Sequence, residues 1–216
     1  MPYERYYRVE SSLTGTAWRA ASQELINNID EIRFFSQNSL EIVKNLLDMK
    51  DSQVSLIPHA PQHQFVPIKL TTSPLTIGFV GAISKVKGAD FVVEFANYLK
   101  QHAPEVGIVI IGSIDTDVAN IPDNIHVHGA YQPEELPSLI DRYGINIGFI
   151  SSLCPETFSY VTQELMMLGI PLVCFDIGAP ADRIRNWNKG MIIPEITTAA
   201  AWATIQKLHN DQNSSK

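Results

Sequence analysis

Apolar segments of strand length alternate with segments of helical periodicity from residue 74 to residue 209. The expected strands are 75–83, 106–113, 124–130, 145–151, 170–178 and 190–195. The run VGIVIIGS at 106–113 is almost continuously apolar, which is typical of a strand that is covered on both faces. Strands that alternate with helices of about 10–15 residues form βαβ units and a parallel sheet. The sequence therefore predicts an α/β fold with a doubly wound, Rossmann-like parallel sheet.

The first 70 residues show a different pattern. One helix, one strand, a second helix and an extended segment are expected there, which is too few strands to bury a sheet. Residues 60–74 carry three prolines and no periodicity, which indicates a linker. We predict that residues 1–70 are the trailing αβ segment of a preceding domain plus this linker, and that residues 71–216 form a second domain. On this interpretation the chain is part of a longer protein.

Composition argues against several classes of protein. The formal net charge of −7 disfavours a nucleic-acid binder that works by neutralising phosphates. No apolar run reaches the roughly 18 residues that span a bilayer, and the first residues, MPYERYYRVESS, contain no apolar core of a secretory signal. Two cysteines, Cys154 and Cys174, are too few for a disulfide framework. We expect both to be free thiols in a reducing compartment, and the protein to be cytoplasmic.

The first candidate site is the loop GAISKVKGAD at 81–90, directly after an expected strand. In open α/β sheets, ligands bind beyond the carboxyl ends of the strands, where the strand order reverses. A loop that turns sharply beside Lys85 and Lys87 can hold a phosphate. The loop matches neither the dinucleotide fingerprint nor the P-loop, so two ordinary solvated lysines are the alternative.

The second candidate site is SSLCPETFSYVTQE at 151–164. A helix is expected to begin near Phe158 or Ser159, and its free N–H groups favour an anion such as a diphosphate. Glu156 precedes this helix, and Glu164 lies about 7.5 Å along its axis, so one carboxylate stands on each side of the anion. That arrangement suits a nucleotide sugar. In the alternative interpretation, Glu156 complements the helix dipole and Glu164 is a solvated helix residue.

The remaining candidates are weaker. Arg183 and Arg185 follow the strand at 170–178 and face either the same crevice or solvent. A metal site is not expected, because the four histidines considered have no further suitable ligand nearby, namely His59, His63, His126 and His128. A hydrolase nucleophile is not expected either, because the serines at 151, 152 and 159 have no GxSxG context.

These loops together resemble a known family. GAISKVKG resembles the G-R-L-x-x-x-K-G loop that opens the C-terminal domain of family 4 retaining glycosyltransferases, which have the GT-B fold. PETFSYVTQELMMLGIPLV resembles the family's two-glutamate segment, commonly E-x-F-G-x-x-x-x-E. The resemblance covers roughly residues 30–208, in the family's order. The pattern that continues through FDIGAPADRIR resembles glycosyltransferase domains of long bacterial surface-polysaccharide proteins.

The resemblance implies an activity and its partners. The activity is transfer of a sugar, with retention, from a UDP, GDP or dTDP sugar to a saccharide or lipid-linked acceptor in polysaccharide or O-antigen biosynthesis. Because the family's acceptor site and frequent catalytic histidine lie in the N-terminal domain, this chain is expected to bind donor without transferring it. Peripheral membrane contact is expected only through that other domain.

The resemblance also implies residue roles. Glu156 is expected to contact the donor sugar as the catalytic residue, and Glu164 to hold the ribose hydroxyls. The backbone at 158–160, which comprises Phe158, Ser159 and Tyr160, is expected to face the diphosphate. Lys87 is expected to neutralise the diphosphate, and Gly81 to let the backbone approach it. No metal cofactor is implied.

The resemblance further implies that the nucleotide base lies near Tyr131. Ala82 stands where the family loop usually has arginine, and Ser159 where it usually has glycine. Lys85, Arg183 or Arg185 is the expected substitute for the missing arginine. Two alternatives remain open: another GT-B sugar-nucleotide enzyme such as an epimerase, which needs acid/base groups around the sugar, and a degenerate, non-catalytic donor domain, which Ala82 favours.

Overall fold

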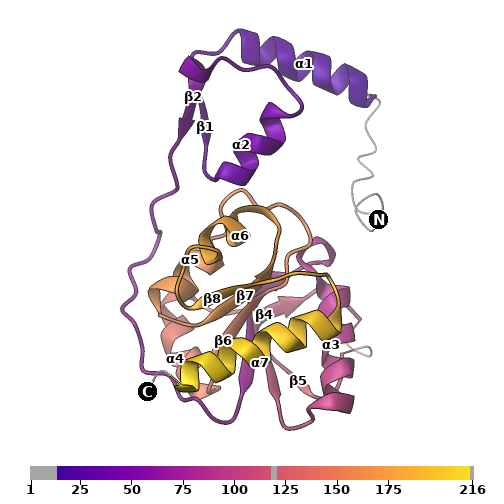
Figure 1. The fold of residues 1–216 in the computed structure, drawn as a ribbon, viewed down its shortest axis with the longest axis vertical. Coiled ribbons are helices and arrows are strands. Elements are labelled where there is room, and N and C mark those ends of the chain that lie inside the picture. Colours follow the sequence, from indigo (N-terminus) through magenta and orange to yellow (C-terminus); the bar gives the residue numbers. More distant parts are fainter. Residues whose placement is uncertain (1–13, 118–120, 215–216) are drawn as a thin grey trace.

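The computed structural model describes residues 14–117 and 121–214, which form a six-stranded and a two-stranded sheet (Figure 1). The larger sheet contains β3 (Thr76–Ile83), β4 (Gly107–Ile114), β5 (Ile125–Gly129), β6 (Ile147–Ile150), β7 (Leu172–Phe175) and β8 (Gly190–Ile193). Its strands are all parallel, in the order β5-β4-β3-β6-β7-β8. The order reverses between β3 and β6, so a ligand crevice is expected at the carboxyl ends of these two strands.

Helices cover both faces of this sheet. One apolar core lies under α3 (Ala89–His102) and α7 (Thr198–Ser214). The other lies under α4 (Leu136–Arg142), α5 (Tyr160–Met167) and α6 (Gly178–Ile184). Neighbouring strand residues alternate between the two cores, as Ile110 and Ile111 do. The predicted doubly wound α/β fold is confirmed.

The N-terminal segment forms a separate αβ unit (Figure 1). It contains α1 (Gly15–Asn27), β1 (Ile32–Phe34), α2 (Gln37–Lys44), a 3-10 turn at Asp51–Gln53 and β2 (Val54–Leu56). β1 and β2 pair in parallel, and α2 lies next to α6 (Figure 1). The backbone N–H of Asn38 donates to Asp182 Oδ2 at 2.9 Å, so a carboxylate of α6 satisfies a free donor in the first turn of α2.

The predicted linker has no helix or strand but is attached to the large sheet. Phe65, Ile68 and Leu70 pack against the core under α4, α5 and α6, and the N–H of Ile68 donates to the carbonyl of Leu168 at 3.1 Å. The domain boundary at residues 70 and 71 stays a prediction. Within the described residues, no helix is long and apolar enough to cross a membrane.

Candidate functional site

A cavity of about 400 Å³ opens at the carboxyl ends of β3 and β6, where the strand order reverses. Its lining combines apolar side chains with polar and charged ones, so it can bind a polar small molecule. It is lined by His59, Val80, Ile83, Lys87, Phe149, Ile150, Ser151, Ser152, Glu156, Thr157, Phe158, Ser159, Tyr160 and Val161.

The start of α5 faces this cavity. The helix begins at Tyr160, with Ser159 as its N-cap, so the predicted start near Phe158 or Ser159 is right to within two residues. The N–H groups of Tyr160, Val161 and Thr162 have no carbonyl partner within the helix, because they belong to its first turn. The side chain of Ser159 does not cap them. These donors and the helix dipole therefore favour an anion in the cavity.

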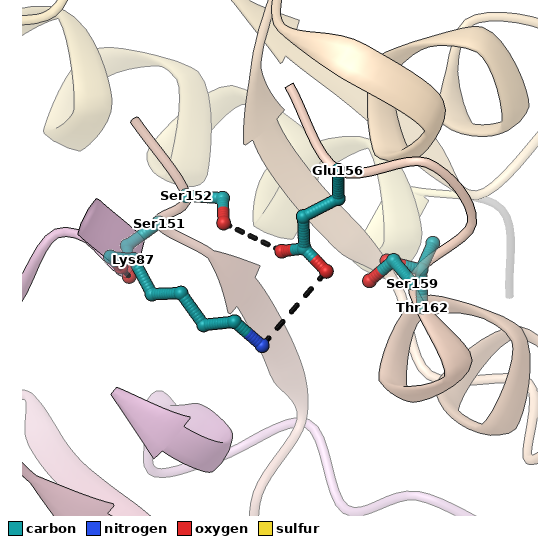
Figure 2. Close-up of polar contacts among 6 residues, drawn as sticks. All are labelled: Lys87, Ser151, Ser152, Glu156, Ser159 and Thr162. Atoms are coloured by element: carbon teal, nitrogen blue, oxygen red, sulfur yellow. Dashed lines mark hydrogen bonds and ion pairs between the residues drawn. The ribbon is translucent and has the colours of Figure 1, made fainter. Parts of the chain in front are cut away.

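Ser159 holds a strained backbone at this helix start. Its φ of 64° makes it the one residue other than glycine with positive φ among residues 14–117 and 121–214. Such a conformation costs roughly 1 kcal/mol in a residue with a side chain, which explains why glycine suits this position. The Thr162 hydroxyl donates to Ser159 Oγ at 2.9 Å and fixes that side chain beside the helix start (Figure 2).

Glu156 projects into the cavity from the loop before α5 (Figure 2). Its Oε1 accepts a hydrogen bond from Ser152 Oγ at 2.5 Å, and its Oε2 lies 3.9 Å from Lys87 Nζ. Its backbone carbonyl accepts from the N–H of Ala179 at 2.9 Å, which ties the loop to α6. The side chain is only 16% exposed. The carboxylate is therefore held at the cavity by specific partners, rather than by the N–H groups of α5.

Lys87 reaches Glu156 because the loop after β3 docks on the chain that leaves β6. Ser151 Oγ donates to the Lys87 carbonyl at 2.8 Å, and the N–H of Leu153 donates to the Val86 carbonyl at 3.0 Å. Gly88 makes this approach possible: its φ is +87°, and a Cβ there would lie 2.3 Å from the Ser151 carbonyl oxygen. Lys85 belongs to the same turn but is exposed and does not line the cavity.

Glu164 lies on α5 but does not line the cavity, and it interacts electrostatically with Tyr131 and His63. Burial raises the pKa of the Glu164 carboxyl above its ordinary value, against the opposing effect of His63. Burial and the nearby Glu164 charge raise the pKa of Tyr131 to about 12. His63 Nδ1 also lies 3.4 Å from Glu134 Oε1. Glu164 on α5 is thus linked electrostatically to Tyr131 and His63, which come from two other parts of the chain.

The two arginines predicted near the crevice are engaged elsewhere. The guanidinium carbon of Arg183 lies 3.7 Å from the centre of the Phe158 ring, and its Nη1 donates to Gln163 Oε1 at 3.1 Å. Burial lowers the pKa of Arg183. Arg185 forms an ion pair with Asp176. Neither arginine lines the cavity.

Gly81 and Ala82 end β3 beside the start of α5. A Cβ on Gly81, whose φ is +100°, would lie 3.4 Å from Val161 Cγ2, so the Gly81 backbone approaches the helix closely. Ala82 is exposed and contributes no charge.

His59 is a cavity residue that the sequence did not single out for this role. Its ring stacks on Phe35 with centroids 3.6 Å apart, and it lies 5.1 Å from the Phe158 ring and 5.7 Å from the Tyr160 ring. The sequence shows only a histidine in a linker, about a hundred positions before α5, and carries no local signal of this contact. The hydrogen bond from Ser152 to Glu156 was missed in the same way.

A family model for glycosyl transferases group 1 matches residues 62–216. The chain belongs to this glycosyltransferase family. Among curated relatives, the capsular polysaccharide biosynthesis glycosyltransferase CapM of Staphylococcus aureus is 23% identical over 192 residues, which is 87% of this chain and 47% of CapM. The chain spans less than half the length of the curated relatives it matches.

Solved structures show the same fold at low identity. S. aureus TarM, a variant of which was solved with fondaparinux, alpha-GlcNAc-glycerol and UDP, has a TM-score of 0.72 at 18% identity, covering 93% of this chain and 42% of TarM. Anabaena HepE, solved with UDP-glucose, has a TM-score of 0.70 at 14% identity, covering 93% of this chain and 60% of HepE. These similarities, with the family match, confirm the predicted family and fold.

Potential metal ligands do not cluster in the described part of the chain. No group of three or more His, Cys, Asp or Glu side chains that could hold a metal ion occurs in residues 14–117 and 121–214. His126 and His128 instead contact Tyr143, whose hydroxyl lies 2.9 Å from His128 Nδ1.

Both cysteines are free thiols, as predicted. Burial raises the pKa of each, and for Cys154 the nearby Glu156 carboxylate adds to the effect. Because the thiolate is the reactive form, we expect slow labelling at pH 7. Ellman's reagent should modify Cys154 more slowly than a small free thiol, and Cys174 only after denaturation. A fast reaction of two thiols in the native protein would contradict this prediction.

Proposed function

We propose that this chain is the donor-binding part of a glycosyltransferase that moves a sugar from a nucleoside diphosphate sugar to a saccharide or lipid-linked acceptor, with retention. One observation carries the proposal: the uncapped start of α5 faces a cavity that Lys87 and Glu156 border from opposite loops. An anion that carries a hydroxyl-rich group fits such a site, because the helix start and the lysine bind the charge and the carboxylate accepts from hydroxyls.

Each residue has a role in this proposal. The diphosphate lies at the start of α5, where its charge meets the free N–H groups and Lys87. Glu156 contacts the donor sugar, and Ser152 orients the carboxylate through the 2.5 Å hydrogen bond. Glu164 accepts from the ribose hydroxyls, with Tyr131 beside it toward the base. The protein accelerates transfer by stabilising the departing diphosphate and orienting the sugar, and it uses no metal for this.

The relatives support the donor and acceptor classes. TarM and HepE were solved with UDP or a UDP sugar, and TarM with saccharide ligands. CapM is named for capsular polysaccharide biosynthesis. We therefore propose a role in bacterial polysaccharide biosynthesis, O-antigen included, with the chain in the cytoplasm. The donors to test are sugars linked to UDP, GDP or dTDP.

Calorimetric titration of the chain with UDP, GDP and dTDP tests this proposal. We expect one nucleotide to bind with a dissociation constant in the micromolar to sub-millimolar range. Free nucleotide lacks the sugar, so the titration isolates the diphosphate and ribose contacts. The absence of binding for all three nucleotides would contradict the proposal.

The two lysines of the β3 loop form a matched pair for this titration. Lys87→Gln should weaken binding of the nucleotide about 5- to 20-fold, because the partly exposed ammonium contributes roughly 1–2 kcal/mol to a bound diphosphate. Lys85→Gln removes the same charge two positions earlier, outside the cavity lining, and should change the affinity less than twofold. Equal losses of affinity in the two variants would mean that the lysines attract the nucleotide only through long-range charge, and that Lys87 makes no specific contact with the diphosphate.

A donor domain that binds without catalysis is the second candidate. Ala82 favours it, because the arginine usual in the resembling family is absent and neither Arg183 nor Arg185 lines the cavity in its place. Nucleotide binding with no donor hydrolysis or transfer, when the chain is tested with the domain that completes the enzyme, would favour this candidate.

A further inference from the structure

The cavity contains a second nitrogen-bearing side chain, His59. Among the residues that line the cavity, only Lys87 and His59 carry side-chain nitrogen. Lys85 is exposed outside the cavity, Arg183 packs on Phe158, and Arg185 is paired with Asp176. A bound diphosphate therefore has one ammonium and one imidazole within the cavity to complement its charge.

The His59 ring is held in place by neighbouring aromatic rings. The Phe35 ring stacks on it at 3.6 Å between centroids and 24° between planes. The Phe158 ring lies 5.1 Å away, nearly perpendicular to the imidazole, and the ring of Tyr160, the first residue of α5, lies 5.7 Å away. Stacking on Phe35 covers one face of the imidazole, and its two nitrogens lie at the edge of the ring, which is the part that can hydrogen-bond a ligand.

The ring nitrogens of His59 are available to a ligand. Among the hydrogen bonds and ion pairs found for residues 14–117 and 121–214, none uses either nitrogen of His59. An imidazole N–H is a good donor to a phosphate oxygen, and its plane is already set, so little side-chain entropy is lost on binding.

We propose that His59 is a donor-binding residue whose imidazole edge donates a hydrogen bond to the diphosphate at the start of α5. This inference rests on the proposed function. His59 takes the place of the charge partner that Ala82 lacks, from a different part of the chain. Because His59 is stacked on Phe35, which follows β1, a bound donor also connects the N-terminal αβ unit to the site.

Two substitutions separate the hydrogen bond from ring packing. His59→Phe keeps an aromatic ring against Phe35 but removes the N–H, whereas His59→Gln keeps an N–H and removes the ring. For the nucleoside diphosphate that the wild type binds, His59→Phe should weaken affinity about 5- to 20-fold. The loss of affinity in His59→Gln should be smaller than that in His59→Phe. The corresponding nucleoside, which lacks the phosphates, should bind both variants as it binds the wild type.

Comparing the diphosphate with the nucleoside distinguishes a phosphate contact from a structural role of His59, because a structural role would affect the binding of both ligands. The inference is overturned, and the proposed function stands, if His59→Phe binds the diphosphate as tightly as the wild type does. The same holds if its affinities for the diphosphate and for the nucleoside fall by the same factor. If the wild type binds no nucleotide, the proposed function itself fails. Thermal melting of each variant, with a Tm near that of the wild type, shows that the comparison is between folded proteins.

Discussion

Replacing Glu164 with alanine is expected to weaken nucleotide binding about 10- to 100-fold, because a carboxylate that accepts from two ribose hydroxyls contributes roughly 1.5–3 kcal/mol to binding. The carboxylate is half-buried and interacts electrostatically with Tyr131 and His63. Calorimetric titration with the nucleotide that binds the wild type measures the loss.

Removing only the charge of Glu164, by Glu164→Gln, should not reduce stability. Burial raises the pKa of Glu164 in the folded protein above its value in the unfolded chain. The folded state therefore binds the proton more tightly, and the ionised carboxylate costs folding free energy at neutral pH, a cost relieved as the pH falls through the folded pKa. Glu164→Gln, which is neutral and of the same size, should keep or raise the Tm at pH 7. Loss of binding without loss of stability is the behaviour of a functional group.

Glu105 provides the matched control. It is exposed and precedes β4, at the edge of the sheet opposite the cavity. Glu105→Ala removes the same charge and should leave both nucleotide affinity and Tm unchanged. Wild-type affinity in Glu164→Ala would assign Glu164 to the solvated face of α5, and a large fall in the Tm of Glu164→Gln would give it a structural role instead.

Substituting Gly112 with alanine is expected to destabilise the protein by about 3–5 kcal/mol, at the upper end of single-residue effects. Gly112 is paired with Gly81 in the β3–β4 register, and its φ is +129°. A Cβ there would lie 2.1 Å from the Gly81 carbonyl oxygen, which is backbone and cannot move aside without separating the two strands. Urea denaturation measures the change in the free energy of unfolding.

Substitutions at two other glycines serve as controls, which separate the cost of a positive φ from the cost of a steric clash. Gly129 has a φ of +94° but nothing within 4 Å of an added Cβ, so Gly129→Ala should cost only about 1 kcal/mol. Gly15 begins α1 with open space around it, and Gly15→Ala should stay within about 0.5 kcal/mol of the wild type. A cost for Gly112→Ala no larger than that for Gly129→Ala would show that β3 and β4 separate easily at this point.

Local patterns in the sequence were sufficient to predict the elements of the fold. The expected strands at 75–83, 106–113 and 124–130 correspond to β3, β4 and β5, and the helix expected after Pro155 is α5. Burial repeats with the period of each element, so these assignments depend on neighbouring residues alone. Strand ends were less well predicted: the strand expected at 170–178 forms only Leu172–Phe175, since pairing with β6 and β8 decides where it stops.

The candidate site, too, could be predicted from the sequence only in part. The spacing of Glu156 and Glu164 around a helix start can be read from ten consecutive residues, and the resemblance to a family rests on such short segments. Spacing alone does not separate Lys85 from Lys87, and only the resemblance to the family pointed to Lys87. The structure places Lys87 in the cavity lining because its turn docks on Ser151 and Leu153. Arg183 was a reasonable charge partner in sequence and is instead held against Phe158.

The sequence by itself thus determined the class of fold, the order of its strands along the chain and the short segments that carry the chemistry. Tertiary structure alone decided that the sheet reverses between β3 and β6, that Tyr131 and His63 interact electrostatically with Glu164, and that His59 stacks on Phe35 near the start of α5. The reason is physical. Hydrophobic periodicity fixes each element locally, whereas contacts between residues tens to a hundred positions apart depend on packing that no local pattern encodes.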